Sequence, residues 1–413
     1  MNYKFSIITP EHKKENIPFL LELYETIKSQ TYSNWEWVLY INGNCKIANI
    51  PQEIREDSKV KIYDGISHSN VGFIKNKAFH LGRGDILVEV DHDDLLHEDC
   101  LKELNEAYQD LDVGFVYSED LLYDMRGDEY KIPWNADNGW TYKWMNFRGE
   151  DFIKIDSFPA TSHSIGIIWY APDHVRSWRT SVYHKLGGHN PDLNICDDHE
   201  LMIRTYLETK FQFIPKVLYY YRWLPGGDNT QLQRSEDIQI KTFELFHQYG
   251  QALAERDADL LNLKKVNLSG EYYPKSEYVN LNLFDINLDG SLPFEDNSVG
   301  VIYAPHVLQK IQDKPKIMSE IYRVLSDGGW AFIEVPSTDG RGAFQDPTHV
   351  SYWNENSFWY YTDQNYAKFI NNTSIKFQKF RLETNWWNDH IAVTTCWLSA
   401  IKSNKKRNHP VRI

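Results

Sequence analysis

The chain has little of what marks secreted, membrane-spanning or nucleic-acid-binding proteins. Its 413 residues contain only four cysteines, which are scattered and form no C-x-x-C pair, so the cysteines predict neither a disulfide scaffold nor a zinc site. No stretch approaches 18 uninterrupted apolar residues, and the apolar run at the N-terminus is too short for a signal peptide. We therefore expect no membrane span and a location in the reducing cytoplasm.

Positive charge is also scarce, since the formal net charge is −14. The only basic run is the tail at 402–413, where a solubilising terminus is the simpler interpretation, so no nucleic-acid partner is expected. Hydrophobic residues, by contrast, make up 42% of the chain and aromatic residues 15%, which is too apolar for disorder. The aromatic side chains could form a core or could contact sugars and nucleobases.

The first part of the chain alternates between strand and helix patterns. Strands are predicted at 3–10, 36–43, 60–65 and 84–91, and helices at 16–30 and 72–82. This alternation indicates β-α-β units in a mixed, mostly parallel sheet. Irregular aromatic segments follow at 131–152 and 157–179, and then a helix at 196–209 and a strand at 211–223.

A long helical pattern from Ser235 to about residue 262 precedes a second alternating region. We predict four parts: residues 1–232, a helical connector at 233–262, a second α/β domain at 263–401, and a basic tail at 402–413. The second domain could also mediate homo-oligomer formation.

Polar side chains fall at the ends of three predicted strands. Thr9, Asn42 and Asp91 occupy these positions, and ligands bind at the carboxyl ends of strands in such sheets. Asp93 and Asp94 follow Asp91 so closely that their charges repel, and an acidic pair at a strand end suits Mg²⁺ or Mn²⁺ shared with a diphosphate. The alternative is a solvated loop in which Asp94 or Asp93 caps the helix predicted over 95–108.

Five segments in order resemble family 2 glycosyltransferases of the GT-A fold. They are SIITP (6–10), SQTYSNWEWVLYINGN (29–44), NVGFIKNKAFHLGRGDILVEVDHDD (70–94), VYHKLGGHNPDLNICDDHELMIR (182–204) and PKVLYYYRW (215–223). The resemblance covers about residues 1–232. It implies transfer of a sugar from a nucleotide donor, with a UDP-sugar favoured, to a hydroxyl of a glycan or other acceptor, with inversion at the anomeric carbon.

The resemblance also implies roles for individual residues. Nucleotide-sugar contacts are expected from Thr9, Pro10, Asn42, Gly43, Lys75, Asp91 and His92. Asn42 stands where the family usually has an Asp that reads the base. The segment 173–230 is similar to bacterial chondroitin polymerases, whose His-x-Arg element supplies a metal-binding His, and His174 and Arg176 match it. The expected ligands of Mn²⁺ or Mg²⁺ are thus Asp91, Asp93 and His174.

The catalytic base is expected in the acidic run at 197–200, which matches the family's acidic pair before a helix. By that match Asp198 takes the proton from the acceptor hydroxyl, and nearby like charges would raise its pKa. Arg176, Asp197 and Trp178 are expected near the donor or the acceptor. Acids favoured by the helix dipole are the alternative for part of the run.

The segment 282–362 is similar to class I S-adenosylmethionine-dependent methyltransferases, but the region before it departs from that pattern. Only Gly270 remains of the glycine-rich turn, Asn282 replaces the acid that binds the ribose, and HVLQKI (306–311) lacks the usual acid and His. A degenerate domain is favoured and S-adenosylmethionine binding is doubtful. The alternatives are a bifunctional glycosyltransferase and methyltransferase, or a non-catalytic glycan-binding protein.

Overall fold

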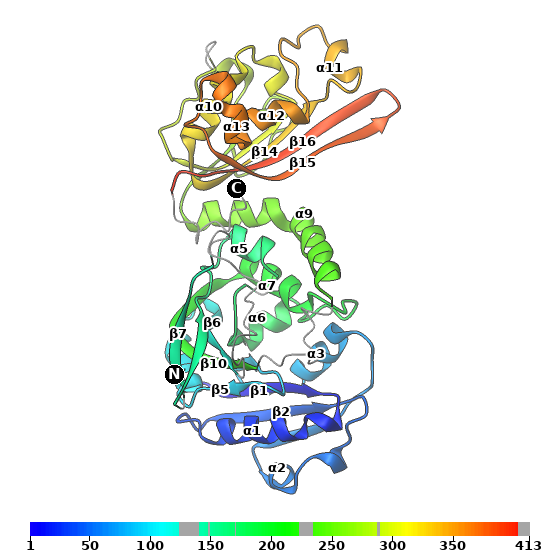
Figure 1. The fold of residues 1–413 in the computed structure, drawn as a ribbon, viewed down its shortest axis with the longest axis vertical. Coiled ribbons are helices and arrows are strands. Elements are labelled where there is room, and N and C mark those ends of the chain that lie inside the picture. The colour runs from blue at the N-terminus through cyan, green and yellow to red at the C-terminus, as the bar shows by residue number, and fades with distance from the viewer. Residues whose placement is uncertain (124–139, 148, 170, 223–233, 287–289, 404–413) are drawn as a thin grey trace. The chain divides into compact units, whose positions relative to one another are not determined.

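The computed structural model describes residues 1–403 except 124–139, 148, 170, 223–233 and 287–289 (Figure 1). The chain divides into two compact units, Met1–Gly250 and Gln251–Ile413. The division falls within helix α9 (Ser235–Leu260), which begins at the residue that the sequence predicts. The boundaries between the four parts predicted from the sequence remain predictions.

The first unit is built on a ten-stranded mixed sheet. Its main path has the order β3-β2-β1-β4-β9-β6-β10-β5, and β7 and β8 lie off this path. The strands are β1 (Phe5–Glu11), β2 (Trp35–Ile41), β3 (Val60–Asp64), β4 (Ile86–Glu89), β5 (Leu95–Leu96), β6 (Val113–Tyr123), β7 (Tyr142–Phe147), β8 (Glu150–Ile155), β9 (Arg176–Arg179) and β10 (Lys210–Arg222). Strands β1 to β4 are parallel to one another, as predicted, whereas β9 runs antiparallel to both β4 and β6.

Helices cover both faces of this sheet because side chains alternate along each strand. In β1, Phe5 and Ile7 pack with α1 and α4, whereas Ile8 packs with α3, α6 and α7 on the other face. The helices of this unit are α1 (Ile17–Lys28), α2 (Gln52–Glu56), α3 (Val71–Phe79), α4 (Cys100–Ala107), α5 (Ser162–Ile167), α6 (Thr180–Lys185) and α7 (Asp197–Glu208).

Two side chains singled out from the sequence have structural partners in this unit. Trp178, expected near the donor or acceptor, is fully buried on the face that carries α3 and α7, and its Nε1 donates to Thr205 Oγ1 at 3.1 Å. The alternating pattern of β9 places this indole in the core. Asp94 caps no helix, because α4 begins only at Cys100 and Asp94 is instead buried against β10.

The aromatic segment at 131–152, predicted to be irregular, contains regular structure where it is described. Strands β7 and β8 pair antiparallel from Tyr142 opposite Ile155 to Phe147 opposite Glu150. No clear two-residue alternation marks this segment, and its residues 131–139 lie outside the described residues. This hairpin joins β6 through β8.

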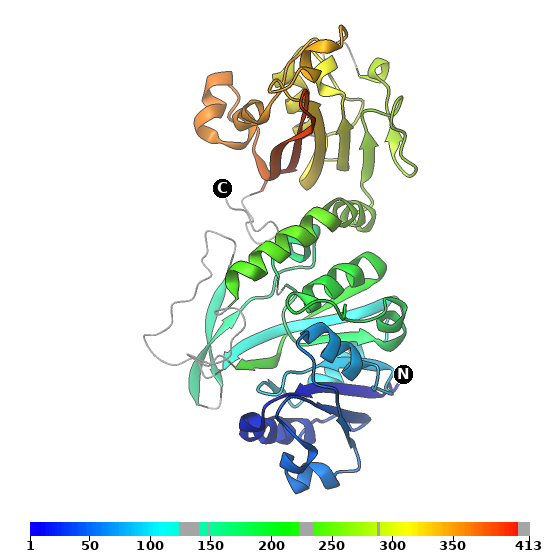
Figure 2. The ribbon, with the colours of Figure 1, turned by 90° about the vertical axis from the view of Figure 1, so that its right-hand side faces the viewer.

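The second unit has a six-stranded sheet with the order β12-β11-β13-β14-β16-β15 (Figure 2). Its strands are β11 (Lys264–Asn267), β12 (Val279–Asn280), β13 (Val299–Pro305), β14 (Leu325–Pro336), β15 (Phe377–Asn388) and β16 (Ile391–Ala400). Its further helices are α10 (Lys314–Val324), α11 (Gly342–Gln345), α12 (Glu355–Thr362) and α13 (Gln364–Ala367). The first four strands are parallel, so the predicted α/β class is confirmed in both units. Among the described helices, none combines the length and the apolar composition that crossing a bilayer requires.

Candidate functional site

The carboxyl ends of β1, β2 and β4 meet at one edge of the first sheet. Glu11 lies opposite Ile41 in the parallel register, and Ile8 lies opposite Glu89. Because β9 is antiparallel, its first residue, Arg176, lies directly opposite Glu89 at the same edge. The register therefore gathers polar residues from four strands, as the sequence predicts for the first three.

Two of the residues predicted to bind the nucleotide have structural partners. Thr9 is fully buried and its hydroxyl accepts a hydrogen bond from Trp37 Nε1 at 3.0 Å, so its side chain packs within the sheet and its contact with a nucleotide stays a prediction. Asn42 donates to the Glu11 carbonyl from both its backbone N–H and its Nδ2, at 2.8 and 3.2 Å. The amide of Asn42 therefore fixes the end of β1.

Pro10 and Gly43 lie at the same strand ends. Pro10 is partly exposed. Gly43 has a positive φ of 61°, and a Cβ at this position would lie 2.4 Å from the His12 carbonyl oxygen. The requirement for glycine thus comes from the close approach of two backbone segments.

Lys75 of α3 forms a buried ion pair with Glu89 at the end of β4. Glu89 is only 1% exposed, and its Oε2 has no hydrogen-bond partner. Burial opposes the charge of Lys75, but Glu89 and Asp91 outweigh it and raise the pKa of Lys75. The side chain predicted to contact base or phosphate is thus already paired with a carboxylate.

Strand β10 holds the loop that carries the acid cluster. Asp94 accepts from the Tyr219 hydroxyl and from the Arg222 backbone N–H, both at 2.7 Å. The Tyr219 hydroxyl also accepts from the Asp91 N–H at 3.2 Å, and Arg222 Nε donates to the Asp93 carbonyl at 2.6 Å. Asp94 thus anchors the loop, and Asp91 and Asp93 keep their carboxylates for other partners.

The pKa values of the two predicted carboxylate ligands shift in opposite directions. Burial raises the pKa of Asp91, but Lys75, His174 and His92 outweigh burial, so the net shift is downward. Asp93 is the more exposed of the two, and burial together with the charge of Asp91 raises its pKa although His92 opposes this. The repulsion between neighbouring acids that the sequence indicates therefore acts on Asp93, through the charge of Asp91.

His174, the third predicted ligand, is buried against β10. Its ring stacks on Tyr219 with centroids 4.6 Å apart, and its Nδ1 is buried without a hydrogen-bond partner. Burial, followed by the charge of Arg176, lowers the pKa of His174 to about 3. A neutral imidazole with an unpaired nitrogen is the form that binds metal ions.

The acidic run of α7 reaches the same region from the other direction. Asp198 Oδ2 accepts from Arg176 Nη1 at 2.5 Å, and both side chains are buried. Burial would raise the pKa of Asp198, but Arg176 and then Lys75 outweigh it and lower the pKa. The expectation that like charges raise the pKa of Asp198 is wrong, because the sequence does not show the arginine beside it.

Asp197, which precedes Asp198, is the acid whose pKa is raised. Burial raises the pKa of Asp197 to about 7, with Lys75 opposing and Asp198 adding to the shift. Asp197 Oδ2 is buried without a hydrogen-bond partner. Glu200, the third acid, forms an ion pair with Arg204 in the same helix and stabilises α7.

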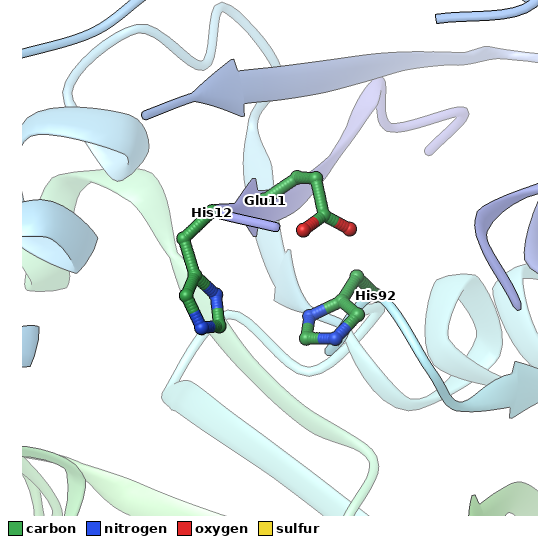
Figure 3. Close-up of side chains that lie close together, drawn as sticks. All are labelled: Glu11, His12 and His92. Carbon is green, nitrogen blue, oxygen red and sulfur yellow. The ribbon is translucent and has the colours of Figure 1, made fainter. Parts of the chain in front are cut away.

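A group that the sequence analysis missed lies beside the acid cluster (Figure 3). Glu11, His12 and His92 each offer one ligand atom, and these atoms lie within 4.8 Å of one another. Within the described part of the chain, the predicted trio Asp91, Asp93 and His174 does not form such a close group. The signal available in the sequence was a Glu-His pair directly after the Thr-Pro that ends the first strand.

In the second unit, the chain's own contacts occupy the edge where β11 and β12 end. A Cβ on Gly270 would lie 2.6 Å from Asn280 Cβ, so the chain itself requires this glycine. Asn282 reciprocally caps a short helix with Asp285, and β12 has only two residues. The cavity at this edge holds about 200 Å³, below the roughly 300–1,000 Å³ of typical ligand pockets.

Two family models match the chain. The model described as glycosyl transferase family 2 matches residues 6–169, and the model described as a methyltransferase domain matches residues 244–333. The first match contains β1, β4 and the acid cluster, and the second contains β11 to β13 and the cavity described above.

Curated relatives are distant. The O-antigen biosynthesis protein RfbC of Myxococcus xanthus is 24% identical over 225 residues, which are 52% of this chain and 16% of that protein. The glycosyltransferase GlyG of Streptococcus pneumoniae serotype 4 is 23% identical over 295 residues, 67% of this chain and 90% of that protein. The chain thus spans a small part of the first relative and most of the second.

Among solved structures, a crystal structure of S. aureus TarS overlaps 63% of this chain and 71% of its own at 15% identity, with a TM-score of 0.44. The mannosyltransferase PcManGT from Pyrobaculum calidifontis, solved with GDP-Man and Mn²⁺, overlaps 61% of this chain and 69% of its own at 17% identity, with a TM-score of 0.43.

Proposed function

Because the chain carries a family 2 glycosyltransferase domain followed by a methyltransferase-type domain, we propose that it is an inverting, metal-dependent glycosyltransferase. It would move a sugar from a nucleotide-diphosphate donor, with a UDP-sugar favoured, to a hydroxyl of a glycan or other acceptor. One observation carries this proposal. The acid cluster, the neutral imidazole of His174 and the acids of α7 lie together at one edge of the sheet. The register of β1, β4 and β9 and the hydrogen bond between Arg176 and Asp198 bring them there.

The residue types expected to hold the metal suit a divalent cation, although their ligand atoms do not form a close group among the described residues. Asp91 and Asp93 supply carboxylate oxygens and His174 supplies the unpaired Nδ1, a donor set that suits Mn²⁺ or Mg²⁺. When bound, the cation would neutralise the charge that develops on the departing diphosphate. The protein's own part is to hold the loop in place, which it does through the hydrogen bonds of Asp94 to Tyr219 and Arg222.

Inverting transfer also needs a base for the acceptor hydroxyl, and we assign Asp198. Arg176 keeps this carboxylate charged and orients it, so that it can accept a proton without first losing one. Asp197 is the second candidate, because its pKa of about 7 and its unpartnered Oδ2 are what a base working near neutral pH requires.

A cytoplasmic location belongs to the same proposal and is supported by the four buried free cysteines.

A thermal-shift screen of UDP-, GDP- and TDP-sugars with and without Mn²⁺ tests the donor class. A ligand at 100 times its Kd stabilises the folded state by about 2.7 kcal/mol, so a true donor should raise Tm clearly. We expect the largest rise with a UDP-sugar and Mn²⁺ together. If no nucleotide sugar raises Tm or is hydrolysed in the presence of metal, a non-catalytic glycan-binding protein becomes the better account.

Asp93→Ala should abolish the metal-dependent part of donor binding. Its side chain is about one third exposed, so its removal deletes one ligand and leaves the core intact. Isothermal titration with a UDP-sugar, with and without Mn²⁺, measures this. Asp192→Ala, which removes an exposed loop carboxylate, is the matched control and should behave like the parent chain. Equal donor affinity in Asp93→Ala and the parent, with and without metal, would remove Asp93 from the site.

The methyltransferase-type domain should not bind S-adenosylmethionine. The glycine at 270 is used by the chain's own packing, and Asn282 stands where an acid would hold the ribose, while Asp285 is engaged in capping the short helix. Calorimetry with S-adenosylmethionine should give no heat of binding at micromolar concentrations. Clear micromolar binding would instead favour a bifunctional enzyme that adds a sugar and methylates it.

A further inference from the structure

Three side chains, of which only His92 is among the expected nucleotide-sugar contacts, point toward a common space in Figure 3. Glu11 is the last residue of β1, His12 follows it, and His92 follows β4 in the adjacent parallel strand. Their nearest ligand atoms lie within 4.8 Å of one another, close enough for one ion to contact all three after small side-chain rotations. The two imidazole rings are nearly perpendicular, with centroids 5.8 Å apart, so they do not stack on each other.

The carboxylate of Glu11 is incompletely satisfied. Glu11 is fully buried; its Oε1 accepts from the Lys13 N–H at 2.7 Å and from Asn16 Nδ2 at 3.2 Å, but its Oε2 has no hydrogen-bond partner. A buried carboxylate oxygen without a donor is costly, and a cation is one of the few groups that can compensate it. This observation is independent of the spacing of the two histidines.

The backbone around this group is fixed before any ligand binds. The His12 carbonyl accepts from the backbone N–H groups of Asn44 and Cys45, at 3.0 and 3.3 Å. Asn16 Nδ2 lies 2.8 Å from His92 Nε2 and also contacts Glu11, so it links two of the three side chains. These hydrogen bonds hold the backbone at His12 and link the side chains of Glu11 and His92, so the group is ordered without a ligand.

We propose that Glu11, His12 and His92 form a Zn²⁺ site that is separate from the oxygen-rich site at Asp91 and Asp93. Two imidazole nitrogens and one carboxylate oxygen are a donor set that Zn²⁺ takes in proteins, whereas Mg²⁺ prefers oxygen ligands. A bound Zn²⁺ would tie the segment after β1 to the loop after β4. The proposal concerns binding alone and stands whether or not the chain transfers sugars.

Titration of the metal-free chain with Zn²⁺ and with Co²⁺ tests the site. We expect one equivalent of Zn²⁺ to bind and to raise Tm, and Co²⁺ to give visible absorption bands of a nitrogen- and oxygen-ligated ion. His12→Ala and His92→Ala should each weaken Zn²⁺ binding at least tenfold. Both residues are at least partly exposed, so these variants should fold, which circular dichroism verifies.

Two control variants test whether Zn²⁺ binds at Glu11, His12 and His92 and not elsewhere. His390→Ala, which removes an exposed histidine from the other unit, should leave Zn²⁺ affinity unchanged. Asp93→Ala should lose Mn²⁺-dependent donor binding but retain Zn²⁺, whereas His12→Ala should do the reverse. The proposal is overturned if the parent chain binds no Zn²⁺. It is also overturned if His12→Ala and His92→Ala bind Zn²⁺ as tightly as the parent chain does.

Discussion

Asp198→Asn is expected to lower kcat by about 10²–10⁴-fold, the range that a positioned general base contributes, while nucleotide-sugar binding persists. Asparagine keeps the shape of the side chain and still accepts a hydrogen bond from Arg176, but it cannot take a proton from the acceptor hydroxyl. Steady-state kinetics measures the loss, and calorimetry with the donor shows that the site is still folded. Normal turnover in this variant would exclude Asp198 as the base.

A control in the same helical turn separates chemistry from stability. Glu200→Gln breaks the ion pair with Arg204, whose guanidinium also donates to the Leu186 and Gly188 carbonyls. This change should lower Tm and leave kcat within a few fold of the parent. Equal losses of kcat in the Asp198 and Glu200 variants would mean that the acids of α7 act through the stability of the helix.

The pH dependence of the rate distinguishes the two candidate bases. Arg176 and Lys75 hold the pKa of Asp198 below its ordinary value against the effect of burial, so Asp198 is charged throughout pH 5–8 and adds no slope there. Asp197, raised by burial to a pKa of about 7 with Lys75 opposing and Asp198 and Glu89 adding, becomes a base only as pH rises through that value. A profile of kcat/KM that is flat over pH 5–8 supports Asp198. A rising limb near pH 7 that disappears in Asp197→Asn would move the role to Asp197.

The sequence predicted the place of the site better than its internal contacts. Strand ends can be predicted because apolar runs stop at polar residues, and parallel strands place those ends at one edge. Asn42, Asp91 and Asp93 lie there as predicted. Local rules failed at Asp94, whose position before a helical pattern suggested a cap, because its partners on β10 are about 125 residues away in the chain.

The pairing of charges at this edge could not be predicted from the sequence. Which acid meets Arg176 is set by the antiparallel entry of β9 beside β4, a tertiary arrangement that no local pattern encodes. The same holds for Lys75 and Glu89, since an acid inside an apolar strand signals an unusual environment but does not name its partner. These pairings determine the protonation of the site, so the charge states follow from the fold.

Lys75→Met is expected to destabilise the folded chain by about 3–5 kcal/mol, the cost of leaving one member of a buried ion pair without its partner. Glu89 would remain almost fully buried with no cation beside it. Burial already raises the pKa of Glu89 although Lys75 opposes this, so losing Lys75 raises it further. When the pKa of a carboxylate is higher in the folded than in the unfolded chain, the folded state loses stability as pH rises above the unfolded pKa. The destabilisation by Lys75→Met should therefore be larger at pH 8 than at pH 5. Urea unfolding at the two pH values measures it.

The double variant Lys75→Met with Glu89→Gln tells a structural lysine from a ligand-binding one. Replacing both partners removes the buried charge, so most of the stability lost in Lys75→Met should return. If Lys75 only pairs with Glu89, the double variant should also recover donor affinity, as measured by calorimetry with a UDP-sugar and Mn²⁺. If the lysine contacts base or phosphate, as the family resemblance implies, stability should return while donor affinity stays low. A double variant as unstable as Lys75→Met would show that the ion pair is not the source of the loss.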